Sequence, residues 1–124
     1  MELEEGPGLG PALRAGKPIP VPCPPDTLAD GLCPPFVGEL PLRIAEEAVD
    51  EVVTVTEYDL IETMKLLVTR AKLVVEASGA AATAALVRGR VSVPPGTRVA
   101  TLVSGGNMDP DTLAAILNGG RTRP

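Results

Sequence analysis

The sequence contains no histidine and no tryptophan, and it has only one phenylalanine and one tyrosine in 124 residues. The lack of histidine excludes a histidine general base, a Ser-His-Asp triad and most zinc sites. Because aromatic side chains are so few, the 44% hydrophobic content rests mainly on alanine and valine, which bury little surface each. We therefore expect a thin core in a chain that has the length of one small domain.

Long apolar runs, a basic surface and a disulfide framework are also missing. Neither an apolar span of about 20 residues nor a signal peptide occurs, which predicts a soluble, cytoplasmic chain without a membrane segment. The net charge is −5 and no basic patch is interleaved with aromatic residues, so nucleic acid is not an expected partner. Cys23 and Cys33 lie ten positions apart, each before a proline, a spacing typical neither of metal ligands nor of a secreted disulfide framework. We expect both to be reduced.

Apolar periodicity predicts helices at residues 39–49 and 57–70. A short helix at 9–15, stopped by Gly16, and an alanine-rich helix at 80–87 are also expected, with a short valine-rich strand at 52–55. Thr56 and Asp59 resemble a capping box at the start of the helix at 57–70. The prolines from Pro18 to Pro25 forbid regular structure, and residues 1–8 show no helical period that defines an independent element. The helix at 80–87 is nearly all alanine, which suits a buried helix packed close to its neighbours.

The stretch from Arg98 to Leu117 has the order strand, glycine loop, helix. Val99 to Val103 form a continuous apolar run with β-branched members, which predicts a strand covered on both faces and therefore a parallel sheet. Asp109 is suited to cap the following helix, and Pro110 fits its first position. The loop between them, Ser104-Gly105-Gly106-Asn107, is either a tight turn or a place where a ligand approaches the sheet edge.

A phosphate on this helix N-terminus is disfavoured, because Asp109 and Asp111 already supply negative charge there. A neutral ligand atom fits better, and the Ser104 hydroxyl is able to donate one hydrogen bond to it. Glu76 ends the apolar run Lys72–Val75 and precedes the alanine-rich helix. Its position is explained either by the preference of carboxylates for helix N-termini or by a role in a site.

Three segments together resemble the carboxyl-terminal half of the threonine dehydratase and serine racemase family of pyridoxal-phosphate enzymes. They read PPDTLADG (24–31), KLVVEASGAAATAALVRGR (72–90) and LVSGGNMD (102–109), and the likeness runs in order from about Glu2 to Leu117. The resemblance implies an α/β fold, in which residues 1–124 form the carboxyl-terminal portion of a doubly wound, mostly parallel catalytic domain of fold type II. It implies conversion of L-threonine or L-serine to a 2-oxo acid and ammonia, although some members racemise serine.

The resemblance also implies roles for individual residues. Ser104 would hydrogen-bond the pyridine nitrogen of the cofactor, Glu76 would lie beside its ring, and Asp30 would lie on the substrate side. The remaining expected cofactor contacts are Gly31, Gly105, Gly106 and Asn107. Glu2 matches a side-chain ligand of the family's divalent-cation site, and Gly6 matches a backbone ligand. Gly8 stands at the position where some members of the family have a second carboxylate ligand. With one hard oxygen ligand missing, strong Mg²⁺ or Ca²⁺ binding is not expected.

The family's Schiff-base lysine and its phosphate loop belong to the amino-terminal half, which this resemblance does not cover. Lys17, Lys65 and Lys72 lack the sequence context of that lysine, so we expect the chain alone to be inactive, and we expect no regulatory domain after it. In one hypothesis this chain is part of an ammonia-lyase and needs the amino-terminal half, or a separate chain that supplies it, for activity. The complete enzyme would then be a homo-oligomer. In the other hypothesis it is a catalytically dead α/β module that acts only by binding a partner chain.

Overall fold

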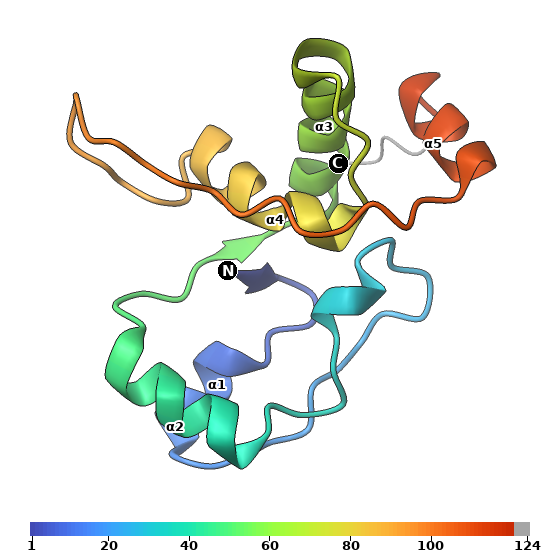
Figure 1. Ribbon diagram of the computed structural model, residues 1–124. Helices are drawn as coiled ribbons and strands as arrows, with labels where there is room; N and C mark the ends of the chain where they lie inside the picture. The colour runs from blue at the N-terminus through green and yellow to red at the C-terminus, as the bar shows by residue number, and fades with distance from the viewer. Residues whose placement is uncertain (121–124) are drawn as a thin grey trace.

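The computed structural model describes residues 1–120, in which each of two short strands is followed by several helices (Figure 1). In chain order they are β1 (Glu2–Leu3), α1 (Leu9–Ala15), the 3-10 turn η1 (Asp30–Leu32), α2 (Glu39–Ala48), β2 (Thr54–Val55), α3 (Glu57–Leu66), the π-helical turn η2 (Leu67–Ala71), α4 (Ala77–Val87) and α5 (Pro110–Leu117). The two strands are parallel, and Glu2 pairs with Thr54 and Leu3 with Val55. The expected α/β class is confirmed.

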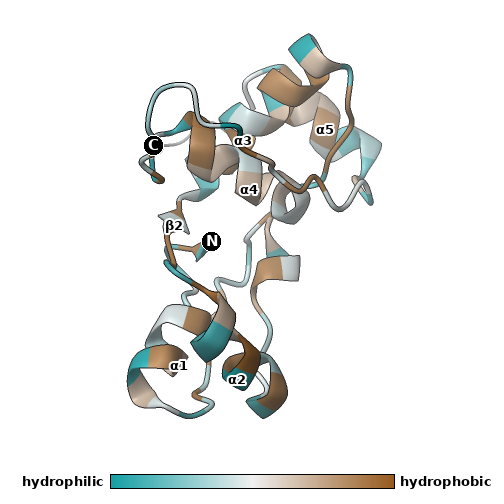
Figure 2. Cartoon of the chain, turned by 60° about the vertical axis from the view of Figure 1, so that its left-hand side comes forward, coloured by the Kyte–Doolittle hydropathy of each residue, from teal (hydrophilic) through white to brown (hydrophobic). Residues whose placement is uncertain are grey.

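The strands separate two groups of helices. Helices α1 and α2 lie at one end, and α3, α4 and α5 lie at the other, in both views of the chain (Figures 1 and 2). Strand β1 falls in the segment for which the sequence predicts no independent element. It forms because the N–H groups of Glu2 and Glu4 donate to the carbonyls of Val53 and Val55, at 2.9 Å each. A strand this short depends on its partner rather than on its own sequence pattern.

The core forms where α3 packs against α4. Alanines on α4 let the two helices approach closely, as predicted, and Leu60, Ile61 and Met64 of α3 fill the space between them. Leu3, Val55 and Ile116 close the cluster from the strands and from α5. The helix bounds confirm the predictions at 9–15 and 39–49 to within one residue, and in Figure 2 α2 shows both apolar and polar patches, as an amphipathic surface helix does.

Helix α3 begins with the predicted capping box. The Thr56 hydroxyl accepts from the Asp59 N–H at 3.1 Å, and the Asp59 carboxylate accepts from the Thr56 N–H at 3.2 Å. The prediction of one helix over residues 57–70 was partly wrong, because the α-helix ends at Leu66 and continues as the π-helical turn η2. Lys72 ends this turn in the left-handed conformation, with φ of 61°.

The predicted strand at residues 99–103 is the main correction. These residues are extended but belong to no strand, and Val99, Leu102 and Val103 are exposed, Leu102 by 75%. The segment runs across α4 (Figure 1), where the Thr83 and Thr101 hydroxyls hydrogen-bond at 3.2 Å. Within residues 1–120 no backbone segment pairs with it, and an apolar run becomes a covered strand only where neighbouring strands and helices exist. None of the helices described is long and apolar enough to span a membrane.

Candidate functional site

The first turn of α4 brings most of the predicted site residues together. Glu76 occupies the N-cap position of α4, but its side chain makes no capping hydrogen bond to that helix. Instead its Oε2 accepts from the Asn107 N–H at 3.0 Å, and its own N–H donates to the Gly105 carbonyl at 3.0 Å. The Glu76 carboxylate therefore holds the 104–107 loop on the end of α4.

Two glycines make this close approach possible. A Cβ atom added at Gly105 would overlap the Glu76 carboxylate, and one added at Gly79 would lie 2.8 Å from the Gly105 nitrogen and 2.9 Å from its oxygen. Real Cβ atoms do not tolerate such distances, so Gly79 requires glycine unless the backbone shifts, and a side chain at Gly105 would require the Glu76 carboxylate or the loop to move. Gly106 is less constrained, because its Cβ would lie 3.3 Å from the Val74 carbonyl oxygen.

The turn that contains Asp30 and Gly31 contacts the same end of α4. A Cβ atom at Gly31 would lie 2.9 Å from the Ser78 hydroxyl oxygen, so Gly31 lies directly against the first turn of that helix. Asp30 is exposed, and its Oδ1 accepts from the Gly31 N–H at 2.8 Å. Segments 30–31, 76–79 and 105–107 thus meet, although they are far apart in the sequence.

Ser104 lies at the rim of this cluster. The residue is exposed, and its hydroxyl makes no hydrogen bond to any other residue in the described part of the chain. Immediately beyond it, the positive end of α5 is neutralised: Asp109 Oδ2 accepts from the Thr112 N–H at 2.7 Å, which lowers the pKa of Asp109. The capping role predicted for Asp109 and Pro110 is confirmed. Ser104 therefore offers a neutral hydroxyl donor, and the helix that follows it in the chain begins with a carboxylate cap rather than with free N–H groups that would hold a phosphate.

Glu2, the expected metal ligand, makes a different set of contacts. Its buried carboxylate accepts from the N–H groups of Gly8 at 2.9 Å, Leu9 at 2.7 Å and Gly10 at 3.2 Å, and so caps the start of α1. Gly6 is buried nearby in the chain and its N–H donates to the Leu3 carbonyl at 3.2 Å. Among residues 1–120 no group of three or more acidic, cysteine or histidine side chains is arranged to hold a metal ion. A cation at Glu2 would have to replace hydrogen bonds that hold α1.

The sequence interpretation missed Ser78 and Gly79. A glycine inside an alanine-rich helix is the available signal, because glycine weakens a helix and is explained there only by a close approach of another segment. The interpretation also assigned Asp59 to the capping box alone. In the structure its carboxylate additionally binds Arg88 Nε at 2.9 Å and Arg90 Nη2 at 2.7 Å.

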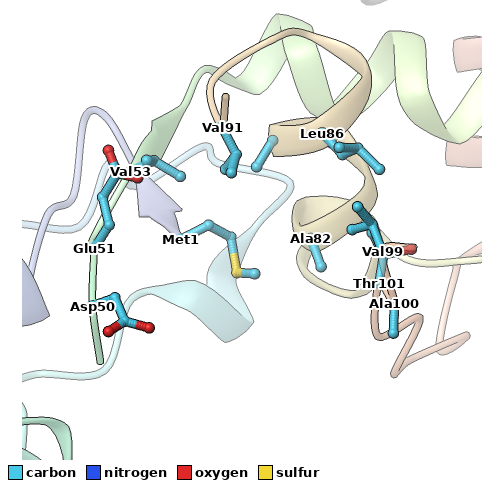
Figure 3. A pocket seen from close by; sticks show the side chains of 11 residues that line it. Met1, Asp50, Glu51, Val53, Ala82, Leu86, Val91, Val99, Ala100 and Thr101 are labelled. Carbon is cyan, nitrogen blue, oxygen red and sulfur yellow. The ribbon is translucent and has the colours of Figure 1, made fainter. Parts of the chain in front are cut away.

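A hollow of about 390 Å³ lies elsewhere, between the segment that precedes β2, helix α4 and residues 99–101 (Figure 3). Met1, Val53 and Leu86 line it together with Val99, Ala100 and Thr101. None of the predicted site residues lines it. We therefore place the candidate site at the α4 end, where hydrogen bonds and close contacts converge, and not at this hollow.

The chain thus has an α/β fold in which the Glu76 carboxylate at the start of α4 binds the glycine loop that carries the Ser104 hydroxyl. Comparison with known proteins gives the family. Residues 1–105 match the family model described as pyridoxal-phosphate dependent enzyme, and the chain belongs to this family.

Individual relatives agree with this family assignment. The chain is 34% identical over 120 residues to the L-threonine ammonia-lyase of Thermotoga maritima, a match that covers 97% of this chain and 29% of the relative. Its fold is similar to the crystal structure of a threonine deaminase from T.th., with a TM-score of 0.75, 38% identity and coverage of 87% of this chain and 36% of that one. Maize serine racemase gives a TM-score of 0.74 at 29% identity, covering 95% and 36% of the two chains. The chain thus spans about a third of the length of these relatives.

Proposed function

We propose that this chain forms the carboxyl-terminal part of a pyridoxal-phosphate-dependent ammonia-lyase that converts L-threonine or L-serine to a 2-oxo acid and ammonia. The observation that supports it best is the exposed Ser104 hydroxyl, which has no protein partner among residues 1–120 and stands on a loop held by Glu76. The names of the relatives, threonine ammonia-lyase and threonine deaminase, support the reaction class.

The residues at this rim fit one edge of the cofactor ring. An uncharged hydroxyl is a suitable donor to a neutral pyridine nitrogen, and the glycine beside it lets the loop that carries this hydroxyl lie closely against Glu76. A bound pyridoxal phosphate would supply an electron sink for bond cleavage at the α-carbon of the amino acid. In this proposal Glu76 and the 105–107 loop form a wall, Gly31 borders the ring, and Asp30 faces the substrate.

The proposal requires a second chain segment to supply the lysine and the phosphate loop. Exposed apolar side chains on the two segments that converge on the site, Leu73 and Val74 before α4 and Leu102 and Val103 before the loop, support a complementary surface there. The complete enzyme would then be a homo-oligomer. The same exposed surface is compatible with a catalytically dead module that binds a partner chain, and activity of the completed enzyme separates the two.

The test uses a fusion of this chain to the amino-terminal half of the Thermotoga maritima relative, compared with Ser104 variants of the same fusion. Ser104→Ala would leave a buried pyridine acceptor unpaired, which costs about 1–3 kcal/mol. Because about 1.4 kcal/mol corresponds to a tenfold change, cofactor affinity or turnover should fall between several-fold and roughly a hundredfold. Ser104→Thr, which keeps the hydroxyl, should have a much smaller effect.

Ser104→Asp is the sharper variant. A carboxylate at this position would favour a protonated pyridine by direct pairing and so change which reactions of the bound amino acid are favoured. The ratio of 2-oxo acid formation to racemisation should therefore shift. If the Ala, Asp and Thr fusions all bind cofactor and turn over like the parent, Ser104 is only a turn residue and the proposed site is wrong.

A further inference from the structure

Two segments on either side of η1 run antiparallel, and their register brings the two cysteines together. An isolated antiparallel bridge pairs Pro20 with Phe36, and the Val21 N–H donates to the Pro35 carbonyl at 3.0 Å. The backbone pairing ends before the cysteines, because the Cys33 N–H donates to the Asp30 carbonyl at 3.0 Å, but the same register extended by two residues would place Cys23 across from Cys33. Residues directly opposed in an antiparallel pair have Cα atoms roughly 4.5–5.5 Å apart, and a disulfide spans roughly 4.4–6.8 Å.

A second contact supports this placement. A Cβ atom added at Gly6 would lie 2.8 Å from the Pro22 carbonyl oxygen, 3.1 Å from the Cys33 sulfur and 3.7 Å from Pro24 Cδ. Gly6 therefore touches the residues on both sides of Cys23 as well as Cys33 itself. Both thiols are free, Cys23 exposed and Cys33 half-buried. Burial, followed by hydrogen bonding to the Cys23 thiol, raises the pKa of Cys33 to about 11.

The sequence around the cysteines keeps the two segments stiff. Each cysteine precedes a pair of prolines, which fix their own φ angles and restrict the preceding residue to extended conformations. Stiff, paired arms lose little conformational freedom when a covalent bond joins them, so the geometry favours bond formation within the chain over reaction of each thiol with a separate molecule.

We propose that Cys23 and Cys33 form a reversible dithiol–disulfide site that reacts with small disulfides of the glutathione type. The exposed Cys23 thiolate attacks one sulfur of the small disulfide, and the other sulfur leaves as a thiolate. The Cys33 sulfur, once deprotonated, then attacks the Cys23 sulfur and releases the second small thiol. Two protein thiols are oxidised by two electrons, one small disulfide is reduced to two thiols, and the two protons pass to solvent or to these thiols.

The bond would close a ring that contains η1. Because η1 carries Asp30 and Gly31, and Gly31 lies against Ser78, oxidation would restrict the turn that borders the candidate site. This consequence rests on the proposed function, whereas formation of the disulfide does not. The experiment below measures the bond itself, so a failure of one proposal leaves the other open to its own test.

The experiment equilibrates the 124-residue chain in glutathione buffers of graded oxidation, in buffer and in concentrated urea, then traps free thiols by alkylation. Cleavage before Asp26 or Asp30 separates the two cysteines, so mass spectrometry distinguishes peptides joined by a disulfide from peptides that each carry glutathione. We expect disulfide-joined peptides from monomeric chains. The effective concentration of the Cys23 and Cys33 thiols towards each other, obtained from the glutathione ratios, should be at least about tenfold higher in buffer than in urea.

The matched control moves one thiol out of register while keeping two cysteines. In the double variant Cys33→Ser, Pro35→Cys the new thiol lies opposite Val21 instead of Cys23, and the effective concentration should fall by roughly tenfold towards the value in urea. The proposal is overturned by equal values in buffer and urea, by mixed glutathione disulfides at both positions, by cross-linked dimers, or by a control variant that closes as readily as the parent.

Discussion

Arg90 Nη2 lies 2.7 Å from Oδ2 of Asp59, and this pair joins the first turn of α3 to the segment that follows α4. Arg88 approaches the other oxygen, with Nε 2.9 Å from Oδ1, and its guanidinium carbon lies over the Tyr58 ring, 5.5 Å from the ring centroid. The Asp59 side chain is only 4% exposed. Its carboxylate therefore caps α3 and fixes α4 against it at the same time, so it supports the platform on which the candidate site stands.

Because of the Asp59 carboxylate, we expect the free energy of unfolding to fall in acid. Burial alone would raise the pKa of Asp59, but hydrogen bonds from Arg90, Thr56 and Arg88 outweigh it and lower the pKa from 3.8 to about 2. Because the pKa is lower in the folded state, the stabilisation is complete above about pH 4 and disappears as the pH falls through 2, and it amounts to roughly 2 kcal/mol. Urea unfolding of the parent and of Asp59→Asn at pH 7, 4 and 2 measures it.

In that series the two chains should differ most at pH 7 and converge near pH 2. Asp26→Asn is the matched control, because Asp26 is exposed and makes no ion pair in the described structure. Its free energy of unfolding should follow that of the parent at every pH. A gap between parent and Asp59→Asn that is as large at pH 2 as at pH 7 would contradict the assignment.

Glu76 is expected to hold the 104–107 loop even without cofactor. Glu76→Ala removes the acceptor of the Asn107 N–H, so amide hydrogen exchange at Asn107 should accelerate between about twofold and tenfold. Glu76→Gln keeps one oxygen and should have a smaller effect. Glu62→Ala removes a carboxylate whose ion-pair partner among residues 1–120 is Lys65, and exchange at Asn107 should not change. An unchanged Asn107 rate in Glu76→Ala would show that the loop does not depend on this contact.

The local signals in the sequence predicted the helices well. The Thr56 and Asp59 capping box and the Asp109-Pro110 start are set by residues within one helical turn, so a single sequence carries the full information. The expected cluster of Glu76, Gly105 and Asn107 was implied by the family resemblance rather than by spacing, and the structure brings these residues together.

The strand predictions were poorer for a physical reason. Val99 to Val103 have the composition of a covered strand, but pairing depends on another segment, and residues 1–120 provide none. Conversely, Glu2 and Leu3 form a strand only because the carbonyls of Val53 and Val55 lie opposite. The ion pairs of Asp59 with Arg88 and Arg90 span about thirty positions of sequence, and no local pattern indicates them.

We expect the effects of substitutions at Gly105 and Glu76 on the unfolding free energy to depend on each other. In Gly105→Ala the new methyl group would overlap the Glu76 carboxylate, so the loop or the carboxylate must move, at a cost of roughly 1–3 kcal/mol in unfolding free energy. Gly106→Ala should cost less, because its methyl group would lie 3.3 Å from the nearest atom, the Val74 carbonyl oxygen. In a Glu76→Ala background the cost of Gly105→Ala should shrink, and a double-mutant cycle measures the difference. Strict additivity would show that the two groups do not interact.

The lysines of this chain are expected to form no specific covalent bond with pyridoxal phosphate. Lys65 Nζ is held by Glu62 at 2.8 Å, Lys72 Nζ donates to the Thr69 carbonyl at 2.7 Å, and Lys17 is exposed. None of them lies in the first turn of α4 or in the 104–107 loop.

Borohydride reduction after incubation with the cofactor, followed by peptide mapping, should give low labelling spread over several lysines. In the fusion with the amino-terminal half of the Thermotoga maritima relative, the label should instead concentrate on one lysine of the added half. Stoichiometric labelling of Lys17, Lys65 or Lys72 in the chain alone, with turnover of threonine, would show that this chain carries its own catalytic lysine and that the requirement for a second segment is wrong.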